Sequence, residues 1–342
     1  MKILVVAPSW IGDCVLAQPL FTLLRRRTPS PDIDVIAPGW TLPVFERMPE
    51  IRRAMLHPFA HGHLRIGDRY RLGRSLAPEH YDAAIVLPNT FKSALLPLFA
   101  GIPLRTGYRG EARGLLLNDV RTFDAEVMPQ LAQRYAALAL PDGAPLTDPL
   151  PLASLSSPQA AREAVVKKLG LGARPAIAFC PGAEYGPAKR WPARHFAAIA
   201  RSCAEQGVDV WLIGSPKDAA TGDEIVALAP GAAVNLCGRT SLAEAIDLLA
   251  AARLVVSNDS GLMHVAAGLA RPLIALYGSS SPRYTPPMSP EARILTLGVE
   301  CSPCFSRECP LGHFRCLNDL VPGQVLQLID FAGILRSSDS PA

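Results

Sequence analysis

The stretch SNDSGLMHVAAGLARPLIALYG, residues 257–278, decides the fold. It follows the apolar run ARLVV, and residues 258–261 (NDSG) separate that run from a helix-forming segment and a second apolar run. A short apolar strand, a polar turn, a helix and another apolar strand make the repeating unit of a parallel α/β sheet. A turn needs a glycine and at most one capping residue. The polar excess therefore predicts that this junction binds a ligand.

The same alternation runs through both halves of the chain. We expect strands at 2–7, 32–38, 81–88, 175–182, 208–215, 253–259 and 272–278, and the main helices of the second half at 192–207, 241–252 and 261–270. Residues 57–76 are rich in His, Arg and Gly and predict a long loop or an irregular helix facing a groove. Such alternation predicts an α/β fold of two doubly wound parallel sheets.

A proline-rich segment marks the division between the two sheets. Residues 141–160 hold five prolines, which is typical of a linker. The sequence therefore predicts one domain over 1–150 and another over 151–342. Ligands of open parallel sheets bind at the carboxyl ends of the strands, so we expect a ligand in a cleft between the two domains.

Composition excludes several classes of protein. No apolar stretch reaches the roughly 20 residues that span a bilayer, and Pro8 and Asp13 interrupt the apolar start too early for a secretory signal. The formal charge of +4 is too small to favour nucleic acid, but it fits anionic substrates or an anionic membrane surface. Eight cysteines in 342 residues do not make a disulfide scaffold, so we expect a cytoplasmic protein.

Two further junctions have more polar or glycine character than packing requires. In APSWIGDCV (7–15), Asp13 lies at a helix entry; the alternatives are a carboxylate that only stabilises the helix start, and a Ser9 that only makes a turn. In CPGAEYGPAKRWP (180–192), backbone amides and Lys189 are suited to an oxyanion, although a solvated surface loop is an equal alternative. That loop lacks the glycine spacing of a phosphate-binding Walker sequence.

The junction at 258–261 has a more specific chemistry. The helix that starts near Ser260 directs unpaired N–H groups and a positive dipole end toward the strand edge. Gly261 lets a ligand approach the backbone, and His264 on the first turn is placed to face the same ligand. The alternatives are an ordinary N-cap and a packed core histidine. We interpret the junction as a site for a diphosphate leaving group.

These motifs together resemble a known family. PSWIGD (8–13), PNTFKSALLPLFAGIPLRTGYRGE (88–111), FCPGAEYGPAKRWP (179–192) and NDSGLMHVAA with RPLIALYG (258–278) are similar to the heptosyltransferase II branch of the ADP-heptose:lipopolysaccharide heptosyltransferases, in glycosyltransferase family 9. The resemblance runs from residue 1 to about residue 290. It implies a GT-B fold, in which two Rossmann-like domains face each other across a cleft. It also implies inverting, metal-independent transfer of L-glycero-D-manno-heptose to the first heptose of the inner core.

The resemblance also implies residue roles. Asp13 matches the general base, and Lys189 matches the lysine that contacts phosphate. Ser260 and Gly261 match the backbone phosphate cradle, and Asp259 and His264 match the residues beside the donor sugar. The other implied donor residues are Gly182, Ala183, Glu184, Gly214, Ser215 and Asp218, with Asp218 for the ribose and Lys217 competing for that position. The acceptor candidates are Ser9, Gly12, Lys92, Arg105, Arg109 and the arginines of 65–74. For each of these cations, solvated surface is the alternative.

The family implies partners as well. They are ADP-heptose as donor, an inner core acceptor linked to lipid A, and the cytoplasmic surface of the inner membrane, with no nucleic acid and no required cofactor. Two alternative functions stay open. One is a heptosyltransferase that acts at another core step (I or III). The other is a regulatory or nucleotide-binding module without turnover, whose cysteine cluster binds a structural metal ion.

A cysteine cluster departs from the family pattern. Cys301, Cys304, Cys309 and Cys316 have C-x2-C-x4-C-x6-C spacing, with His313 among them. The first pair allows tetrahedral zinc, although the whole pattern is no standard finger. We expect the cysteine cluster to cross-link this loop locally and to have no role in catalysis. Structural zinc, reduced thiols and a disulfide all stay open, and zinc ranks behind the other two.

Overall fold

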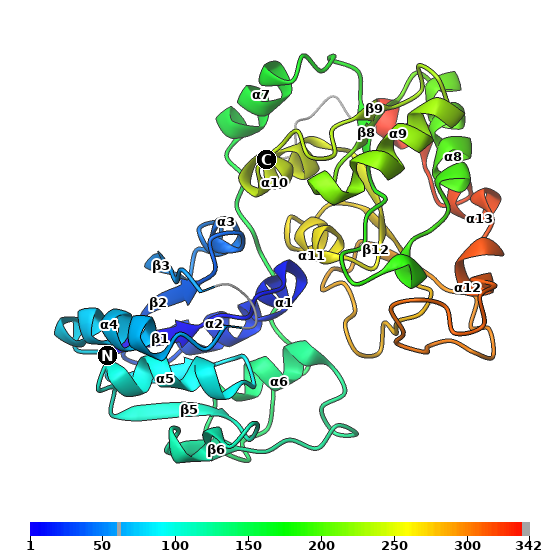
Figure 1. Cartoon of the computed structure of the whole chain (residues 1–342). Helices are drawn as coiled ribbons and strands as arrows, with labels where there is room; N and C mark the ends of the chain where they lie inside the picture. The colour runs from blue at the N-terminus through cyan, green and yellow to red at the C-terminus, as the bar shows by residue number, and fades with distance from the viewer. Residues whose placement is uncertain (60–62, 337–342) are drawn as a thin grey trace. The chain divides into compact units, whose positions relative to one another are not determined.

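The computed structural model describes residues 1–59 and 63–336 and consists of two compact units (Figure 1). The first unit is Met1–Leu155 and the second begins at Ser156, close to the division predicted between residues 150 and 151. Residues 60–62, inside the loop expected over 57–76, and residues 337–342 of the second predicted domain lie outside the described residues.

The first unit is built on a parallel six-stranded sheet in the order β3-β2-β1-β4-β5-β6. Its strands are β1 (Lys2–Val6), β2 (Asp32–Ala37), β3 (Arg53–Leu56), β4 (Ala83–Val86), β5 (Leu104–Tyr108) and β6 (Asp119–Arg121). In the centre, Val5 of β1 lies opposite Val35 on one side and Ile85 on the other. Apolar side chains cover both faces because helices pack on both, as the near-continuous apolar strands predict.

The helices of the first unit form two layers. They are α1 (Ile11–Leu16), α2 (Gln18–Arg25), α3 (Leu42–Phe45), α4 (Ile66–Leu76), α5 (Phe91–Phe99), α6 (Leu131–Ala137) and the short 3-10 helices Ala77–Glu79 and Arg113–Leu115. Helices α4 and α5 pack together, whereas α1 and α2 pack against α6 (Figure 1). Part of the stretch expected as a loop or irregular helix is thus the regular helix α4. Gly73 permits this packing, since a Cβ there would lie 2.5 Å from Phe99 Cβ.

The second unit repeats the design with the order β12-β11-β10-β7-β8-β9, again all parallel. Its strands are β7 (Ala176–Cys180), β8 (Asp209–Leu212), β9 (Val234–Asn235), β10 (Leu254–Asn258), β11 (Leu273–Leu276) and β12 (Ala292–Leu295). Its helices are α7 (Gln159–Lys168), α8 (Ala193–Glu205), α9 (Ala219–Leu228), α10 (Leu242–Ala251), α11 (Gly261–Gly268), α12 (Arg315–Asn318), α13 (Pro322–Leu326), α14 (Phe331–Arg336) and the 3-10 helices η3 (Pro187–Lys189) and η4 (Pro216–Asp218).

Helices cover both faces of this sheet too. Helix α8 packs with α9 and α13 over one apolar core, while α10 packs with α7 and α11. The prediction of two doubly wound α/β units is therefore confirmed. Within the described residues, no helix is both long and apolar enough to cross a bilayer.

Candidate functional site

The centre of the candidate site is an ion pair between two sequence-predicted residues. Lys189 Nζ, from the 3-10 helix η3 after β7, lies 2.5 Å from Asp259 Oδ2, directly after β10. Strands β7 and β10 are neighbours, so their following loops meet at the carboxyl edge of the sheet. Ser280, from the loop after β11, donates its hydroxyl to the same carboxylate oxygen. The Asp259 side chain is only 4% exposed, so the Lys189 ammonium largely balances its buried charge.

Asn258 holds the loop that carries Lys189. Its fully buried side-chain amide accepts a hydrogen bond from Trp191 N at 3.0 Å and donates one to Pro181 O at 2.7 Å. The two contacts fasten both ends of the 181–191 loop to the last residue of β10. Sequence analysis assigned Asn258 no role of its own. An asparagine at a strand end does signal this one, because its amide can accept and donate at the same time.

The start of α11 carries backbone amides that its N-cap side chain does not cap. Ser260 is the N-cap residue in an extended conformation, yet its side chain makes no capping hydrogen bond. The first amides of α11, beginning at Gly261, are therefore not capped by Ser260 and lie beside Asp259. Such amides, with the positive end of the helix dipole, suit an oxyanion.

His264 belongs to the same helix and is buried. Burial lowers the pKa of His264 to about 4, partly opposed by the Asp259 carboxylate and assisted by the Lys189 ammonium. The imidazole is therefore neutral near pH 7. Its Nδ1 has no hydrogen-bond partner among the described residues. A buried neutral imidazole with an unused nitrogen beside the ion pair is able to accept or donate one hydrogen bond to a ligand.

The turn after β8 differs from the ribose contact expected of Asp218. The Asp218 carboxylate is buried and accepts hydrogen bonds from Ser215 N at 2.9 Å and Ser215 Oγ at 2.8 Å. These bonds close the turn before α9, which is a structural role. Asp218 also explains the glycines around it: a Cβ on Gly182 would lie 2.3 Å from Asp218 Cγ, and one on Gly214 would lie 3.0 Å from Asp218 Cβ.

The remaining predicted donor residues lie on the same loops. Ala183 is buried, whereas Glu184 is exposed and forms an ion pair with Lys217. This pair joins the loop after β7 to the turn after β8 at the surface. It leaves the position of a ribose contact unassigned.

In the first unit, Asp13 lies at the corresponding carboxyl edge. It occupies the first turn of α1, which follows β1, and it is partly exposed. Gly12 beside it is buried, and the Ser9 carbonyl accepts a hydrogen bond from Trp40 Nε1 at 2.9 Å. The tryptophan fixes the turn that leads into α1, so the carboxylate of Asp13 is presented by an ordered junction.

Two predicted acceptor cations share this edge with Asp13, and one does not. Lys92 lies in the first turn of α5 after β4, and the exposed Arg109 follows β5. Strands β1, β4 and β5 are successive neighbours, so their three carboxyl ends are adjacent. Arg105, by contrast, lies near the amino end of β5, and its guanidinium donates to Leu116 O and Ile102 O at 2.7 and 2.6 Å. These bonds give Arg105 a structural role in place of the expected acceptor contact.

Three of the four arginines of 65–74 are also engaged locally. Arg65 and Arg71 both pair with Asp68. Arg69 is buried, stacks over the Phe59 ring at 4.1 Å and donates to Leu64 O at 2.7 Å.

Sequence analysis missed Arg113, which organises this edge. Its guanidinium is fully buried and donates to Tyr108 O at 2.7 Å, to Asn89 Oδ1 at 3.0 Å and to Pro88 O. Burial lowers the pKa of Arg113 to about 10, so it stays charged. One side chain thus ties the loops after β4 and β5 together. The sequence shows only one more arginine in a basic stretch, so no signal distinguished it.

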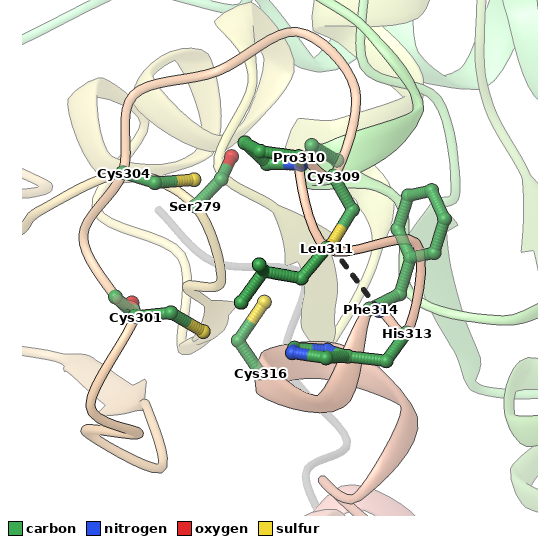
Figure 2. Close-up of a pocket in the computed structure, with 11 residues that line it drawn as sticks. Ser279, Cys301, Cys304, Cys309, Pro310, Leu311, His313, Phe314 and Cys316 are labelled. Carbon is green, nitrogen blue, oxygen red and sulfur yellow. Dashed lines mark hydrogen bonds between the residues drawn. The ribbon is translucent and has the colours of Figure 1, made fainter.

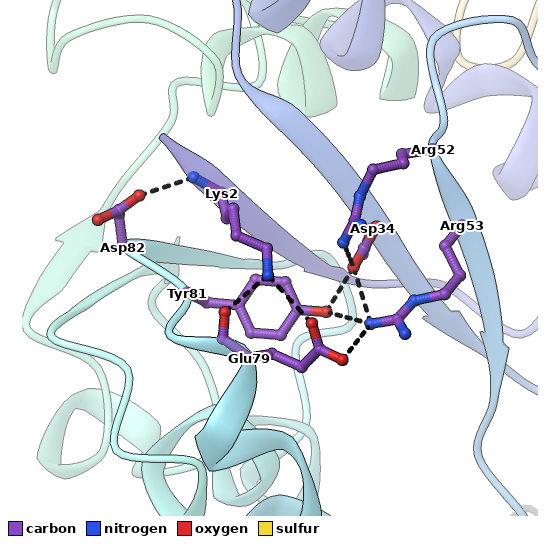
Figure 3. A network of polar contacts seen from close by, with 7 residues as sticks. All are labelled: Lys2, Asp34, Arg52, Arg53, Glu79, Tyr81 and Asp82. Carbon is purple, nitrogen blue, oxygen red and sulfur yellow. Dashed lines mark hydrogen bonds and ion pairs between the residues drawn. The ribbon is translucent and has the colours of Figure 1, made fainter.

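A second polar cluster lies near the opposite, amino edge of the first sheet (Figure 3). The buried Asp34 of β2 accepts hydrogen bonds from Arg52 at 2.6 Å, Arg53 at 3.1 Å and the Tyr81 hydroxyl at 2.6 Å. Glu79 extends the network to Lys2. Because the cluster is remote from the carboxyl edge that carries Asp13, it is a stabilising feature and not part of the candidate site.

The described residues include no group of three or more His, Cys, Asp or Glu side chains already arranged around a metal position.

Two Rossmann-like units with polar strand edges define a two-domain α/β protein of the GT-B class, and comparison with known proteins places it further. A family model described as glycosyltransferase family 9 (heptosyltransferase) matches residues 69–315. Lipopolysaccharide heptosyltransferase 2 of Escherichia coli K12 is 47% identical, over 96% of this chain and 97% of that protein. Lipooligosaccharide heptosyltransferase 2 of Haemophilus influenzae is 48% identical, over 96% of this chain and 99% of that protein.

Solved structures agree with these relatives. The structure of E. coli ADP-heptose lps heptosyltransferase II superposes with a TM-score of 0.88 at 45% identity and covers 98% of both chains. An E. coli heptosyltransferase solved with ADP shares the fold at 21% identity and a TM-score of 0.72. The chain belongs to glycosyltransferase family 9, the heptosyltransferases. The resemblance seen in its motifs is confirmed, and the protein is a glycosyltransferase.

Proposed function

We propose that the protein transfers L-glycero-D-manno-heptose from ADP-heptose to the first heptose of the lipopolysaccharide inner core, with inversion at the anomeric carbon. The observation that carries the donor assignment is the grouping of Lys189, Asp259 and the start of α11 at one strand edge. The printed names of the relatives at 47% and 48% identity support the same reaction.

In this proposal the second unit holds the diphosphate. The amides at Gly261 and beyond bind its oxygens, and Lys189 shares its ammonium between Asp259 and a phosphate oxygen. The negative charge that develops on the departing ADP is stabilised by these fixed donors, which is the largest need of such a reaction. Asp259 and the neutral His264 are left to accept or donate hydrogen bonds to the donor sugar.

The first unit supplies the base and the acceptor contacts. Asp13 takes the proton from the acceptor hydroxyl as that oxygen attacks the anomeric carbon, while the diphosphate leaves without needing a proton. Ser9, Gly12, Lys92 and Arg109 are the remaining acceptor candidates, because they lie on the loops at the same edge as Asp13. The reaction requires that Asp13 reach the sugar bound by the second unit.

Acceptor and location belong to the same proposal. A lipid A-linked acceptor places the enzyme at the cytoplasmic surface of the inner membrane as a peripheral protein. No nucleic acid partner and no catalytic cofactor are proposed, since an inverting transfer needs only the base and the charge stabilisation described above.

Mass spectrometry of the product tests the proposal. The full-length protein is incubated with ADP-heptose and, in separate reactions, with Kdo2-lipid A, with heptosyl-Kdo2-lipid A and with the acceptor that carries both heptoses. We expect one added heptose on heptosyl-Kdo2-lipid A only. Addition to another acceptor would assign the protein to another core step. No product from any acceptor, with ADP bound, would indicate a nucleotide-binding protein without turnover.

A further inference from the structure

Half of the cysteines line one pocket (Figure 2). Cys301, Cys304, Cys309 and Cys316 surround a cavity of about 180 Å³ together with His313, Leu311 and Ser279. The other four cysteines, Cys14, Cys180, Cys203 and Cys237, are each buried among the strands and helices of the two cores. The pocket thiols are thus the ones that packing does not explain.

The segment that carries these thiols has little regular structure. Between the end of β12 at Leu295 and the start of α12 at Arg315, the chain forms neither helix nor strand. We call residues 301–316 the Cys-rich segment. A loop of this length without a core of its own is the setting in which a bound metal ion supplies folding energy.

The backbone around Cys309 is arranged for a sulfur ligand. Residues 309–314 turn tightly, with Gly312 at φ +69°, a left-handed conformation that glycine adopts readily. The turn brings Phe314 N back to Cys309 Sγ at 3.4 Å, and Figure 2 shows this hydrogen bond at the pocket wall. The backbone therefore already contacts this sulfur and holds Cys309 at the wall of the pocket.

We propose that the four pocket cysteines bind one zinc-class divalent ion in tetrahedral coordination. Two short spacings, Cys301 to Cys304 and Cys309 to Cys316, supply the two halves of the ligand set. In the structure the sulfur atoms line the cavity without converging, and the Leu311 side chain lies among them (Figure 2). Leu311 is 64% exposed, so it is able to swing outward at little cost while the thiol side chains rotate onto the ion.

The Cys-rich segment contacts the loop that carries Lys189. Phe305 O of the Cys-rich segment accepts a hydrogen bond from Tyr185 Oη at 2.6 Å, and Arg307 O accepts one from Ala188 N at 3.0 Å. On its other side the segment contacts the 278–280 turn, where Phe305 N donates to Ser279 O at 2.7 Å. An ion that fixes the Cys-rich segment therefore also fixes both loops that hold Asp259. The proposed metal site stands whatever ligand those loops bind.

Metal analysis of the full-length protein, purified without chelator, tests the proposal. We expect about one zinc-class ion per chain, as for a four-cysteine structural site. Cys304→Ala and Cys316→Ala should each lower the metal content well below one ion per chain, because each removes a ligand. Cys203→Ala, at a buried cysteine of α8 outside the pocket, is the matched control and should keep the full content. Circular dichroism checks that each variant is folded.

A second measurement keeps the test decisive if a variant fails to fold. Reduced, metal-free wild-type protein is titrated with Co2+, and thiolate-to-cobalt charge-transfer absorption should saturate at one equivalent. Three results would overturn the proposal: no metal in the protein together with no cobalt absorption, equal metal in all variants, or fewer than eight free thiols in denaturant. The last result, with the cross-linked cysteines located by peptide mapping at the pocket, would show a disulfide in place of a metal site.

Discussion

Lys189 Nζ and Asp259 Oδ2 lie 2.5 Å apart, although 70 positions separate the two residues in the chain. Each comes from a different loop, and each loop follows a neighbouring strand of the second sheet. Ser280 and Asn258 hold the two partners in place from further loop and strand positions. The pair gives the strand edge one positive and one negative charge, held side by side.

Replacing Lys189 should weaken donor binding. Lys189→Met removes a charge-assisted contact worth about 1.5–3 kcal/mol, which corresponds to a loss in ADP affinity of roughly 10- to 150-fold. Isothermal titration with ADP measures the loss. Lys168→Met, at an exposed lysine of α7, is the control and should bind ADP as the wild type does. Equal affinities for the two variants would remove Lys189 from the phosphate site.

Replacing Asp13 should abolish turnover and leave donor binding intact. Asp13→Asn keeps the size of the side chain but removes the base, and loss of a general base lowers kcat by about 10²- to 10⁴-fold. Steady-state assays with ADP-heptose and heptosyl-Kdo2-lipid A measure kcat, and ADP titration measures binding. Asp32→Asn, at an exposed residue that begins β2, serves as the control. A normal rate in Asp13→Asn would mean that another group is the base.

Asn258→Ala should loosen the 181–191 loop. It leaves Trp191 N and Pro181 O without their buried partner, at a cost of about 1–3 kcal/mol for each unsatisfied group. We expect lower stability to urea and weaker ADP binding together. Asn118→Ala also removes two hydrogen bonds, but at an exposed amide of the first unit, so water replaces them. If Asn258→Ala left both stability and ADP affinity unchanged, the proposed fastening of this loop would be wrong.

His264 should make folding sensitive to mild acid. Burial holds its folded pKa at about 4, below the ordinary value of 6.5. Between these values the unfolded chain binds a proton that the folded chain does not, so stability falls as pH decreases, by up to about 1.4 kcal/mol per pH unit. His264→Gln should flatten the dependence of the free energy of unfolding on pH between pH 6.5 and 5. His57, whose pKa burial also lowers to about 4, acts in the same direction, so the variant is compared with the wild type.

His80→Gln, at an exposed histidine, is the control for His264→Gln. Its free energy of unfolding should depend on pH as that of the wild type does. A pH dependence in His264→Gln identical to that of the wild type would mean that His264 carries its proton in the folded protein.

The Asp34 cluster should matter for stability alone. Asp34→Ala leaves the buried Tyr81 hydroxyl without its acceptor, at a cost of about 1–3 kcal/mol. Arg52 and Arg53 are 41% and 40% exposed, so water replaces part of their contact. Asp82→Ala, at an exposed carboxylate of the same region, should cost about 1 kcal/mol or less. Thermal unfolding measures both variants. A loss of ADP affinity in Asp34→Ala at temperatures where it is folded would contradict the separation of this cluster from the donor site.

Much of the fold followed from local patterns. Apolar runs alternating with helical segments predicted both parallel sheets, because the two periods are encoded by neighbouring residues. The break between α1 and α2 and the regular helix α4 were not predicted. Pro19 in the first turn of α2 restarts the helix there, and α4 depends on the close approach of Gly73 to Phe99, which no local pattern reports.

The candidate site was predicted in its parts and not in its contacts. Lys189 and Asp259 were both singled out, because residue type and position after a strand suffice for that. Their direct pairing, and the fastening role of Asn258, depend on which strands are neighbours. Arg105 and Asp218 show what local patterns do not report: their residue types suit a ligand, but in the structure nearby carbonyls and amides engage both side chains.

A crystal structure with ADP tests the account most directly. We predict the diphosphate at the start of α11, with its oxygens within hydrogen-bond reach of the amides from Gly261 onward and of Lys189 Nζ, and with Lys189 drawn partly away from Asp259. ADP bound elsewhere, with the Lys189–Asp259 pair unchanged and the start of α11 unoccupied, would contradict it.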